Sequence, residues 1–278
     1  MRRRDTPLQL DLRAILRRRM PRRIARFVPG FLIAPLERLI RQRDLNALLR
    51  GAFPAEGSAF SASILDQLGI EVETEGLDRL RGMRRLVFAS NHPLGGLDGI
   101  TMVMLLGETF GDSHIRVLVN DMLMNVEPLA GVFLPINKYG RQARESAVRI
   151  NEAYASDMNI CVYPAGLVSR LGDDGRICDL EWQKAFVAKA LETGRDIVPV
   201  AFHALNSRRF YRLARLRKKL GIKVNIEQVL LPGEIFSQRR KRFRVVFGEP
   251  VTAVELRESG ESPAILASRL REAVVKML

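Results

Sequence analysis

The sequence has 278 residues, a formal net charge of +14 and only two cysteines. This length suits one large domain, or one domain with a small appendage, and is sufficient to bury an ordinary core. Neither Cys161 nor Cys178 has a partner at ligand spacing, which excludes a disulfide framework and a zinc site and predicts two reduced, structural cysteines in a cytoplasmic protein.

Most of the positive charge lies in residues 1–50, where 14 arginines outnumber four acidic residues and give +10, so that only +4 is left for the other 228 residues. Apolar residues recur between these arginines at an approximately helical period. We therefore predict a basic amphipathic helical arm with its linker over residues 1–57. Such an arm either lies on an anionic membrane surface or packs as a solvated helix on the main domain.

Two other roles fit the arm less well. Its longest apolar run, residues 27–36, spans ten residues, whereas a membrane-spanning helix needs roughly twenty, and there is no secretory cleavage site. Arginine-rich arms also bind nucleic acid, but residues 1–26 contain no aromatic side chain that could stack on bases. We expect no nucleic-acid partner and a protein that is soluble or peripheral.

Residues 58–278 alternate between helical and strand patterns, which predicts a single α/β domain with a largely parallel twisted sheet flanked by helices. Strands are expected at 70–74, 86–89, 115–119, 159–163, 196–202 and 243–247. Helices are expected at 58–68, from 98 to about 106, at 141–154, 181–192, 208–220 and 262–278, with a further short helix ending near 127–128.

The stretch 86–102 combines a short apolar strand, a polar loop that contains His92, and a helix that begins at Asp98. α/β proteins usually place their chemistry at such a strand–loop–helix junction. A histidine acts as a general base when a carboxylate fixes its tautomer, and Gly95 and Gly96 would let the loop bring Asp98 under the ring. Taken alone, the pattern is more often an incidental histidine beside a helix N-cap aspartate.

The neighbouring blocks change this interpretation. In order, they are S-N-H-x5-D from Ser90, G-x-F-L-P-I-N from Gly131, Y-P-A-G from Tyr163 and F-G-E-P-V from Phe247. Over roughly residues 70–251 this order resembles the glycerolipid (lysophosphatidic-acid-type) acyltransferase superfamily. In that family a histidine deprotonates an acceptor, which attacks an acyl thioester on acyl-carrier protein or coenzyme A, and an aspartate orients the histidine. The resemblance implies these roles for His92 and Asp98, with no cofactor and no metal.

Three departures from the family pattern concern the acceptor. Five residues instead of four separate His92 from Asp98, as in an N-H-P-x-G-x-x-D-G branch that resembles bacterial aminolipid (glycine- or ornithine-lipid) acyltransferases. The second block normally ends in an arginine and here ends in Asn137, and the third, normally F-P-E-G-T-R, reads Y-P-A-G-L-V here. Arginine grips phosphate bidentately, so its loss argues against a glycerol-phosphate acceptor. Nearby basic residues could replace it: Lys138, Arg141, Arg144 and Arg170.

The predicted catalytic residues are His92 and Asp98. The predicted substrate-binding residues are Asn91, Gly95, Gly96, Asn137, Lys138, Pro164, Ala165, Gly166 and Arg170. Backbone amides near Gly95 and Gly96, or near Gly166, would stabilise an oxyanion. His114 and His203 are expected to be ordinary surface or core histidines, and Lys184 a solvated side chain.

A basic helical stretch, residues 208–223, interleaves cations with apolar side chains. It fits a docking surface for acidic acyl-carrier protein or anionic lipid, or a solvated helix.

The sequence therefore predicts an acyltransferase that moves a fatty acyl group from acyl-carrier protein or coenzyme A to a lipid precursor. The acceptor would be an amino acid or acylated amino acid, and the enzyme would lie on the inner face of the cell membrane, with an arm over 1–57 and a catalytic domain over 58–278. Three alternatives stay open: a lysophosphatidic acid acyltransferase, a nucleic-acid-binding protein, and a non-catalytic family member that binds lipid.

Overall fold

The computed structural model describes residues 5–19, 30–136, 141–172, 174–222 and 224–278. In this part of the chain, a seven-stranded sheet has the order β1-β9-β8-β2-β5-β3-β4. The strands are β1 (Glu71–Glu75), β2 (Val87–Ser90), β3 (Ile115–Asn120), β4 (Phe133–Ile136), β5 (Asn159–Val162), β8 (Ile197–His203) and β9 (Arg242–Phe247). All neighbours pair in parallel except β8 and β9, so β1 and β9 run opposite to the other five strands. The predicted α/β fold with a largely parallel sheet is confirmed.

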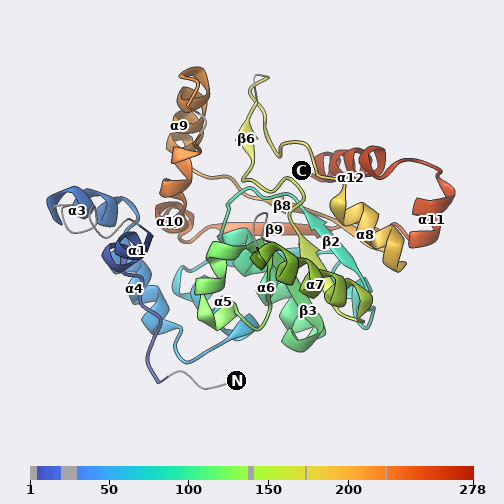
Figure 1. Ribbon diagram of the computed structural model, residues 1–278, viewed down its shortest axis with the longest axis horizontal. Helices are drawn as coiled ribbons and strands as arrows, with labels where there is room; N and C mark the ends of the chain where they lie inside the picture. The colour runs from blue at the N-terminus through green and yellow to red at the C-terminus, as the bar shows by residue number, and fades with distance from the viewer. Residues whose placement is uncertain (1–4, 20–29, 137–140, 173, 223) are drawn as a thin grey trace.

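Helices cover both faces of the sheet (Figure 1). Side chains such as Phe88 and Val198 point to the face covered by α5 (Gly57–Gln67) and α6 (Leu97–Phe110). Val87 and Ala201 belong to the core on the other face. That core is completed by α7 (Arg141–Ala155), α8 (Ala185–Thr193), α11 (Ala253–Glu258) and α12 (Pro263–Met277).

Strand β2 lies in the middle of the sheet between β5 and β8, and all four of its residues are buried. This burial on both faces explains why the run 86–89 is continuously apolar instead of alternating. The carboxyl ends of β2, β5 and β8 therefore meet at one edge of the sheet. The chain that leaves β2 at this edge is the His92 loop.

Several predicted boundaries were wrong. Helix α6 continues to Phe110 instead of ending near 106. Helix α8 starts at Ala185 instead of 181, because Trp182 Nε1 donates to Asp179 Oδ2 (3.0 Å) and the Gln183 amide donates to the Pro164 carbonyl (3.0 Å), which holds this stretch in an irregular conformation. The short helix near 127–128 is a pair of 3₁₀ turns, Asp121–Asn125 and Glu127–Leu129.

The structure also contains elements that the patterns did not reveal. An antiparallel hairpin joins β6 (Arg170–Leu171) to β7 (Ile177–Cys178) after the third block. Strand β4 forms one edge of the sheet, a position that tolerates its Pro135.

The arm contains α1 (Leu12–Arg19), α3 (Gly30–Leu39) and α4 (Gln42–Gly51), so the predicted helical character is confirmed for its described residues. Leu48 of α4 is buried, and Leu45 and Leu49 pack against the main core. Part of the arm is therefore attached to the domain. Among the described residues, no helix is both long enough and apolar enough to cross a membrane.

Helix α9 (Arg208–Lys219) follows β8 and extends away from the sheet, on the same side as the β6 hairpin (Figure 1). Ser207 caps its first turn by accepting from the Phe210 amide, and Ser207 is in turn held by Glu234 of α10 (Leu231–Glu234). Phe210 and Tyr211 are buried at this base. The helix is thus fixed at one end and free of the sheet at the other.

Candidate active site

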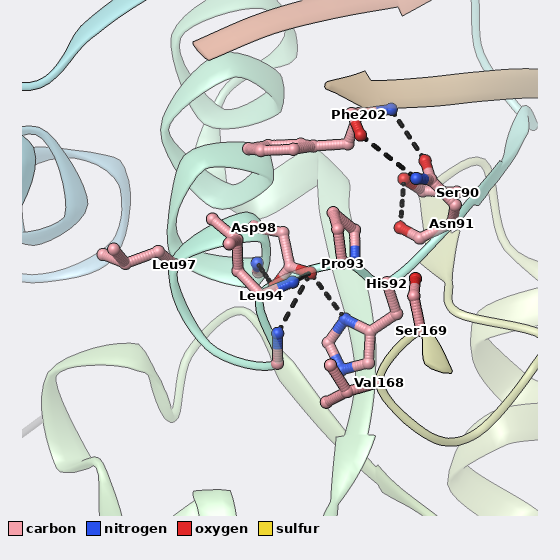
Figure 2. A network of polar contacts seen from close by, with 12 residues as sticks. Ser90, Asn91, His92, Pro93, Leu94, Leu97, Asp98, Val168, Ser169 and Phe202 are labelled. Carbon is pink, nitrogen blue, oxygen red and sulfur yellow. Dashed lines mark hydrogen bonds and ion pairs between the residues drawn. The ribbon is translucent and has the colours of Figure 1, made fainter. Parts of the chain in front are cut away.

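The loop after β2 brings His92 and Asp98 into contact (Figure 2). Nδ1 of His92 lies 2.9 Å from Oδ2 of Asp98, so the five-residue spacing still allows the pair to form. The Asp98 side chain is fully buried, whereas the His92 side chain keeps 19% of its surface exposed. Because Nδ1 faces the carboxylate, Nε2 on the opposite side of the ring is the nitrogen that can exchange a proton with a ligand.

Asp98 also organises the loop itself. Its Oδ2 accepts the amides of Leu94 (2.9 Å) and Gly95 (3.2 Å), and its Oδ1 accepts the amide of Gly99 (2.8 Å). Asp98 lies in the first turn of α6, where the helix dipole favours a negative charge. These donors compensate for the burial of the carboxylate.

Gly95 is required by two features of the loop. Its φ of +76° lies in the left-handed region, which strongly favours glycine. A Cβ at this position would lie 2.5 Å from Val168 Cγ2 and 3.0 Å from Leu231 Cδ1. A side chain here would push the loop away from the third block. Gly96 faces open space instead.

The His92–Asp98 contact changes the pKa values of both groups. Burial opposes the charged imidazolium, but the Asp98 carboxylate more than compensates and holds the pKa of His92 above 6.5. Burial likewise opposes the Asp98 carboxylate, but His92 and the loop amides hold its pKa below 3.8. At neutral pH, Asp98 is therefore a fixed negative charge that stabilises an imidazolium when one forms.

Asn91 anchors the loop to β8. Its Nδ2 donates to the Phe202 carbonyl (3.1 Å), and its Oδ1 accepts the Phe202 amide (2.7 Å). Asn91 was predicted to bind substrate, but the structure shows its amide engaged with this backbone. Two residues further on, the Pro93 carbonyl accepts a hydrogen bond from Nδ2 of Asn206 (2.9 Å).

A second buried carboxylate, Asp179, holds the backbone of His92 in place. Oδ1 of Asp179 accepts the His92 amide (3.1 Å) and the Ser169 hydroxyl (2.6 Å), and its Oδ2 accepts Nε1 of Trp182 (3.0 Å). Burial raises the pKa of Asp179, against the effect of these donors. No local pattern predicted Asp179, since nothing around position 179 in the sequence signals a contact with a residue 87 positions earlier.

The third block forms the opposite wall of the site. The ring of Tyr163 lies against that of His92, with centroids 4.2 Å apart, and the Ser169 amide donates to the His92 carbonyl (2.9 Å). Pro164 and Ala165 are buried beside it, whereas Gly166 is exposed, has a φ of +65° and donates its amide to the Tyr163 carbonyl (2.9 Å). The structure thus brings the His92 loop and this block together, as the block order predicted.

Arg170 has a different environment from the one predicted. Its Nη2 lies 2.8 Å from Oε1 of Glu227, its Nη1 donates to the Val168 carbonyl (2.8 Å), and Nε of Arg217 lies 2.8 Å from Oε2 of the same glutamate. A contact between Arg170 and an acceptor would require the guanidinium to turn away from Glu227. Asn137 and Lys138, also predicted to bind substrate, lie outside the described residues.

Other predicted features are placed as follows. His114 is exposed, and His203 lies at the end of β8, away from the His92 loop in sequence. Both cysteines are free thiols. Within the described ranges, no three His, Cys, Asp or Glu side chains gather where they could hold a metal ion.

Comparisons with known proteins identify the family of the chain. A family model described as "Acyltransferase" matches residues 14–272. A lyso-glycine lipid O-acyltransferase from Phocaeicola vulgatus is 37% identical over 273 residues, covering 98% of this chain and 96% of its own. A protein of the same description from Bacteroides thetaiotaomicron is also 37% identical and is covered over 99% of its length. Among solved structures, the 1-acyl-sn-glycerophosphate (LPA) acyltransferase PlsC from Thermotoga maritima has a TM-score of 0.47 and 14% identity, covering 89% of this chain and 92% of that chain.

Proposed function

The chain belongs to the acyltransferase family, and on that basis we propose that it transfers a fatty acyl group from a thioester to the hydroxyl of a singly acylated glycine-type lipid. The observation that carries this proposal is the 37% identity to two lyso-glycine lipid O-acyltransferases over 98% of this chain. The missing arginines of the second and third blocks support an acceptor without a phosphate, since they are the side chains suited to hold one.

In the proposed mechanism, His92 is the general base. Its Nε2 takes the proton of the acceptor hydroxyl, and the oxygen attacks the carbonyl carbon of the thioester. Asp98, 2.9 Å from Nδ1, keeps the proton on Nδ1 before the reaction and stabilises the imidazolium afterwards. When the carbon–sulfur bond breaks, the imidazolium returns its proton to the departing thiolate, which leaves an ester and a free thiol.

The developing oxyanion needs backbone N–H donors, and amides that already donate to other groups are less suited to this role. The Gly95 amide already donates to Asp98, and the Gly166 amide already donates to Tyr163. We therefore propose the Gly96 amide, on the open side of the loop, as one donor. Pro164, Ala165 and Gly166 would form the facing wall of the substrate site, next to Tyr163.

The acyl donor is proposed to be acyl-carrier protein or coenzyme A, and the enzyme to lie peripherally on the inner face of the cell membrane. Residues 58–278 would form the catalytic domain, and residues 1–57 the basic arm that assists attachment. The +10 charge of residues 1–50 supports an anionic surface as the partner.

The test is expression in a host that lacks aminolipids, supplied with singly acylated glycine lipid, followed by lipid mass spectrometry. We expect a diacylated product that is absent when His92→Ala is expressed at the same level. In parallel, the purified enzyme is offered acyl-carrier-protein and coenzyme A thioesters with the same lipid or with lysophosphatidic acid. Acylation of lysophosphatidic acid alone would overturn the proposed acceptor, and lipid binding without any product would overturn the proposed reaction.

A further inference from the structure

The far end of α9 combines two kinds of exposed side chain. We call residues 215–222 and 224–229, which include the end of α9 and most of the following 3₁₀ helix η5 (Ile226–Leu230), the α9 tip. Leu220 and Val224 are 64% and 70% exposed, and four more apolar side chains of the tip are exposed too: Leu216, Ile222, Ile226 and Val229. Six exposed apolar side chains within fifteen residues exceed the scattered single ones that a soluble surface carries.

The charges around this apolar group have one sign. Residues 208–226 contain eight lysines and arginines and no acidic residue. The first carboxylate after them, Glu227, is fully buried and lies 2.8 Å from Arg170 and 2.8 Å from Arg217, so it pairs with Arg217 and does not itself add negative charge to the surface. Arg212, Arg215 and Lys219 are exposed along α9.

The position of the tip leaves it accessible. Helix α9 contacts the β6 hairpin and η5, and it rises away from the sheet on the side of the hairpin (Figure 1). It follows β8, whose carboxyl end lies beside the His92 loop through the Asn91–Phe202 contacts. A partner that binds the α9 tip would therefore lie at the same edge of the sheet as the His92 loop.

We propose that the α9 tip inserts its apolar side chains into an anionic phospholipid bilayer while the flanking cations bind the lipid headgroups. An apolar face bordered by Lys and Arg is the composition of an interfacial membrane element. The inference extends the proposed function, which places the enzyme on a membrane without assigning the element that inserts. Its test measures membrane binding without turnover, so the two proposals fail separately.

An acidic protein such as a carrier protein would pair with the cations but would leave the apolar side chains exposed to water. Docking of that kind depends on charge complementarity at an exposed rim. A bilayer satisfies both, because its headgroups are anionic and its interior accepts Leu, Ile and Val. The apolar component of binding therefore distinguishes the two partners.

The first experiment is flotation of the full chain with vesicles of phosphatidylcholine containing about 30% phosphatidylglycerol, a fraction chosen to give a strongly negative surface. The variant Leu216→Ser/Leu220→Ser/Val224→Ser keeps every charge, and we expect its partitioning to fall about tenfold or more. The matched control is Val254→Ser/Ile265→Ser/Val275→Ser, whose wild-type side chains are also exposed but lie on α11 and α12, away from α9 (Figure 1). The control should float like the wild type.

The second experiment measures insertion directly, so that attachment through the arm does not obscure the result. Val224→Trp is compared with Val254→Trp in the same vesicles. We expect a blue-shifted emission and quenching by brominated lipid at position 224 only, on top of the common signal from buried Trp182. Equal emission at both positions in vesicles that float the protein would overturn the proposal. So would normal flotation of the serine variant together with loss of acyl-carrier-protein binding in Arg212→Gln/Arg215→Gln/Lys219→Gln, a result that would assign the tip to an acidic protein.

Discussion

Asp98 and Glu227 are both fully buried carboxylates, and the negative charge of each is compensated by nitrogen atoms of neighbouring groups. Asp98 lies against one histidine and accepts three loop amides. Glu227 lies between Arg170 of the β6 hairpin and Arg217 of α9. The two regions use the same chemistry of charge compensation, but only one of them contains a group that gains and loses a proton near neutral pH.

This difference is the one expected between the proposed reactive centre and a structural cluster. An arginine stays protonated at any physiological pH, so the Arg170–Glu227–Arg217 cluster can hold two elements together but cannot transfer a proton. A histidine can exchange a proton and serve as a base, and the Asp98 carboxylate raises the pKa of His92. Four substitutions test whether the two regions divide their roles in this way.

The largest effect is expected from His92→Ala. Removing the proposed base should lower kcat/KM by about 10³- to 10⁴-fold, because proton transfer by a positioned group contributes on that scale. The measurement is a steady-state acyl transfer assay, accompanied by thermal unfolding to show that the fold is kept. His114→Ala, at an exposed histidine, is the control and should retain full activity. An active His92→Ala enzyme would show that His92 is not the base, and the Asp98 region would then be structural like the Glu227 cluster.

Glu227→Gln should affect stability instead of chemistry. It leaves Arg170 and Arg217 facing each other without their shared anion, and breaking a buried ion pair costs about 3–5 kcal/mol of unfolding free energy. Denaturant unfolding measures this loss. Glu249→Gln, whose wild-type carboxylate pairs with Arg79 at the surface, should change stability by less than about 0.5 kcal/mol. If folded Glu227→Gln enzyme lost activity as His92→Ala does, the cluster would belong to the reactive centre.

Asp98→Asn should lower kcat by about 10²-fold, since a neutral amide no longer fixes the tautomer or stabilises the imidazolium. The pH profile gives a sharper test. In the wild type the pKa of His92 is raised above 6.5, so activity should fall on the acidic side of that pKa as the imidazole becomes protonated. Without the Asp98 charge, burial dominates and lowers that pKa, and the acid limb of kcat/KM should move to lower pH. Glu227→Gln, which removes a carboxylate not in contact with the imidazole, should leave the limb in place.

The sequence predicted the His92 centre because its residues are close in the chain. One strand, one loop and one helix contain His92, Gly95 and Asp98, and local patterns define each of these elements. The strands of the main sheet were predicted in the same way, from apolar runs. Helix α11 and the two-residue strands of the β6 hairpin were not predicted, because they are too short to produce a pattern.

The rest of the site depends on contacts that no local pattern encodes. Asp179 reaches the His92 amide across 87 positions, and Glu227 reaches Arg170 across 57. Arg170 was accordingly predicted from its position near the third block to bind substrate, because the sequence did not show that a buried glutamate would meet it. Only the folded chain reveals which cations near the site are already paired.

Arg170→Lys is expected to have the smallest effect of the four. The lysine keeps the positive charge beside Glu227 but loses the planar contact, so we expect a stability loss of about 1 kcal/mol and a KM for the lipid acceptor within about twofold of the wild type. Arg217→Lys is the matched control, because it makes the same change on the other side of the same carboxylate. A KM that rises tenfold for Arg170→Lys and not for Arg217→Lys would show that Arg170 leaves Glu227 to hold the acceptor. In that case Arg170 would exchange between Glu227 and the acceptor, and the substrate site would extend to the cluster beside α9.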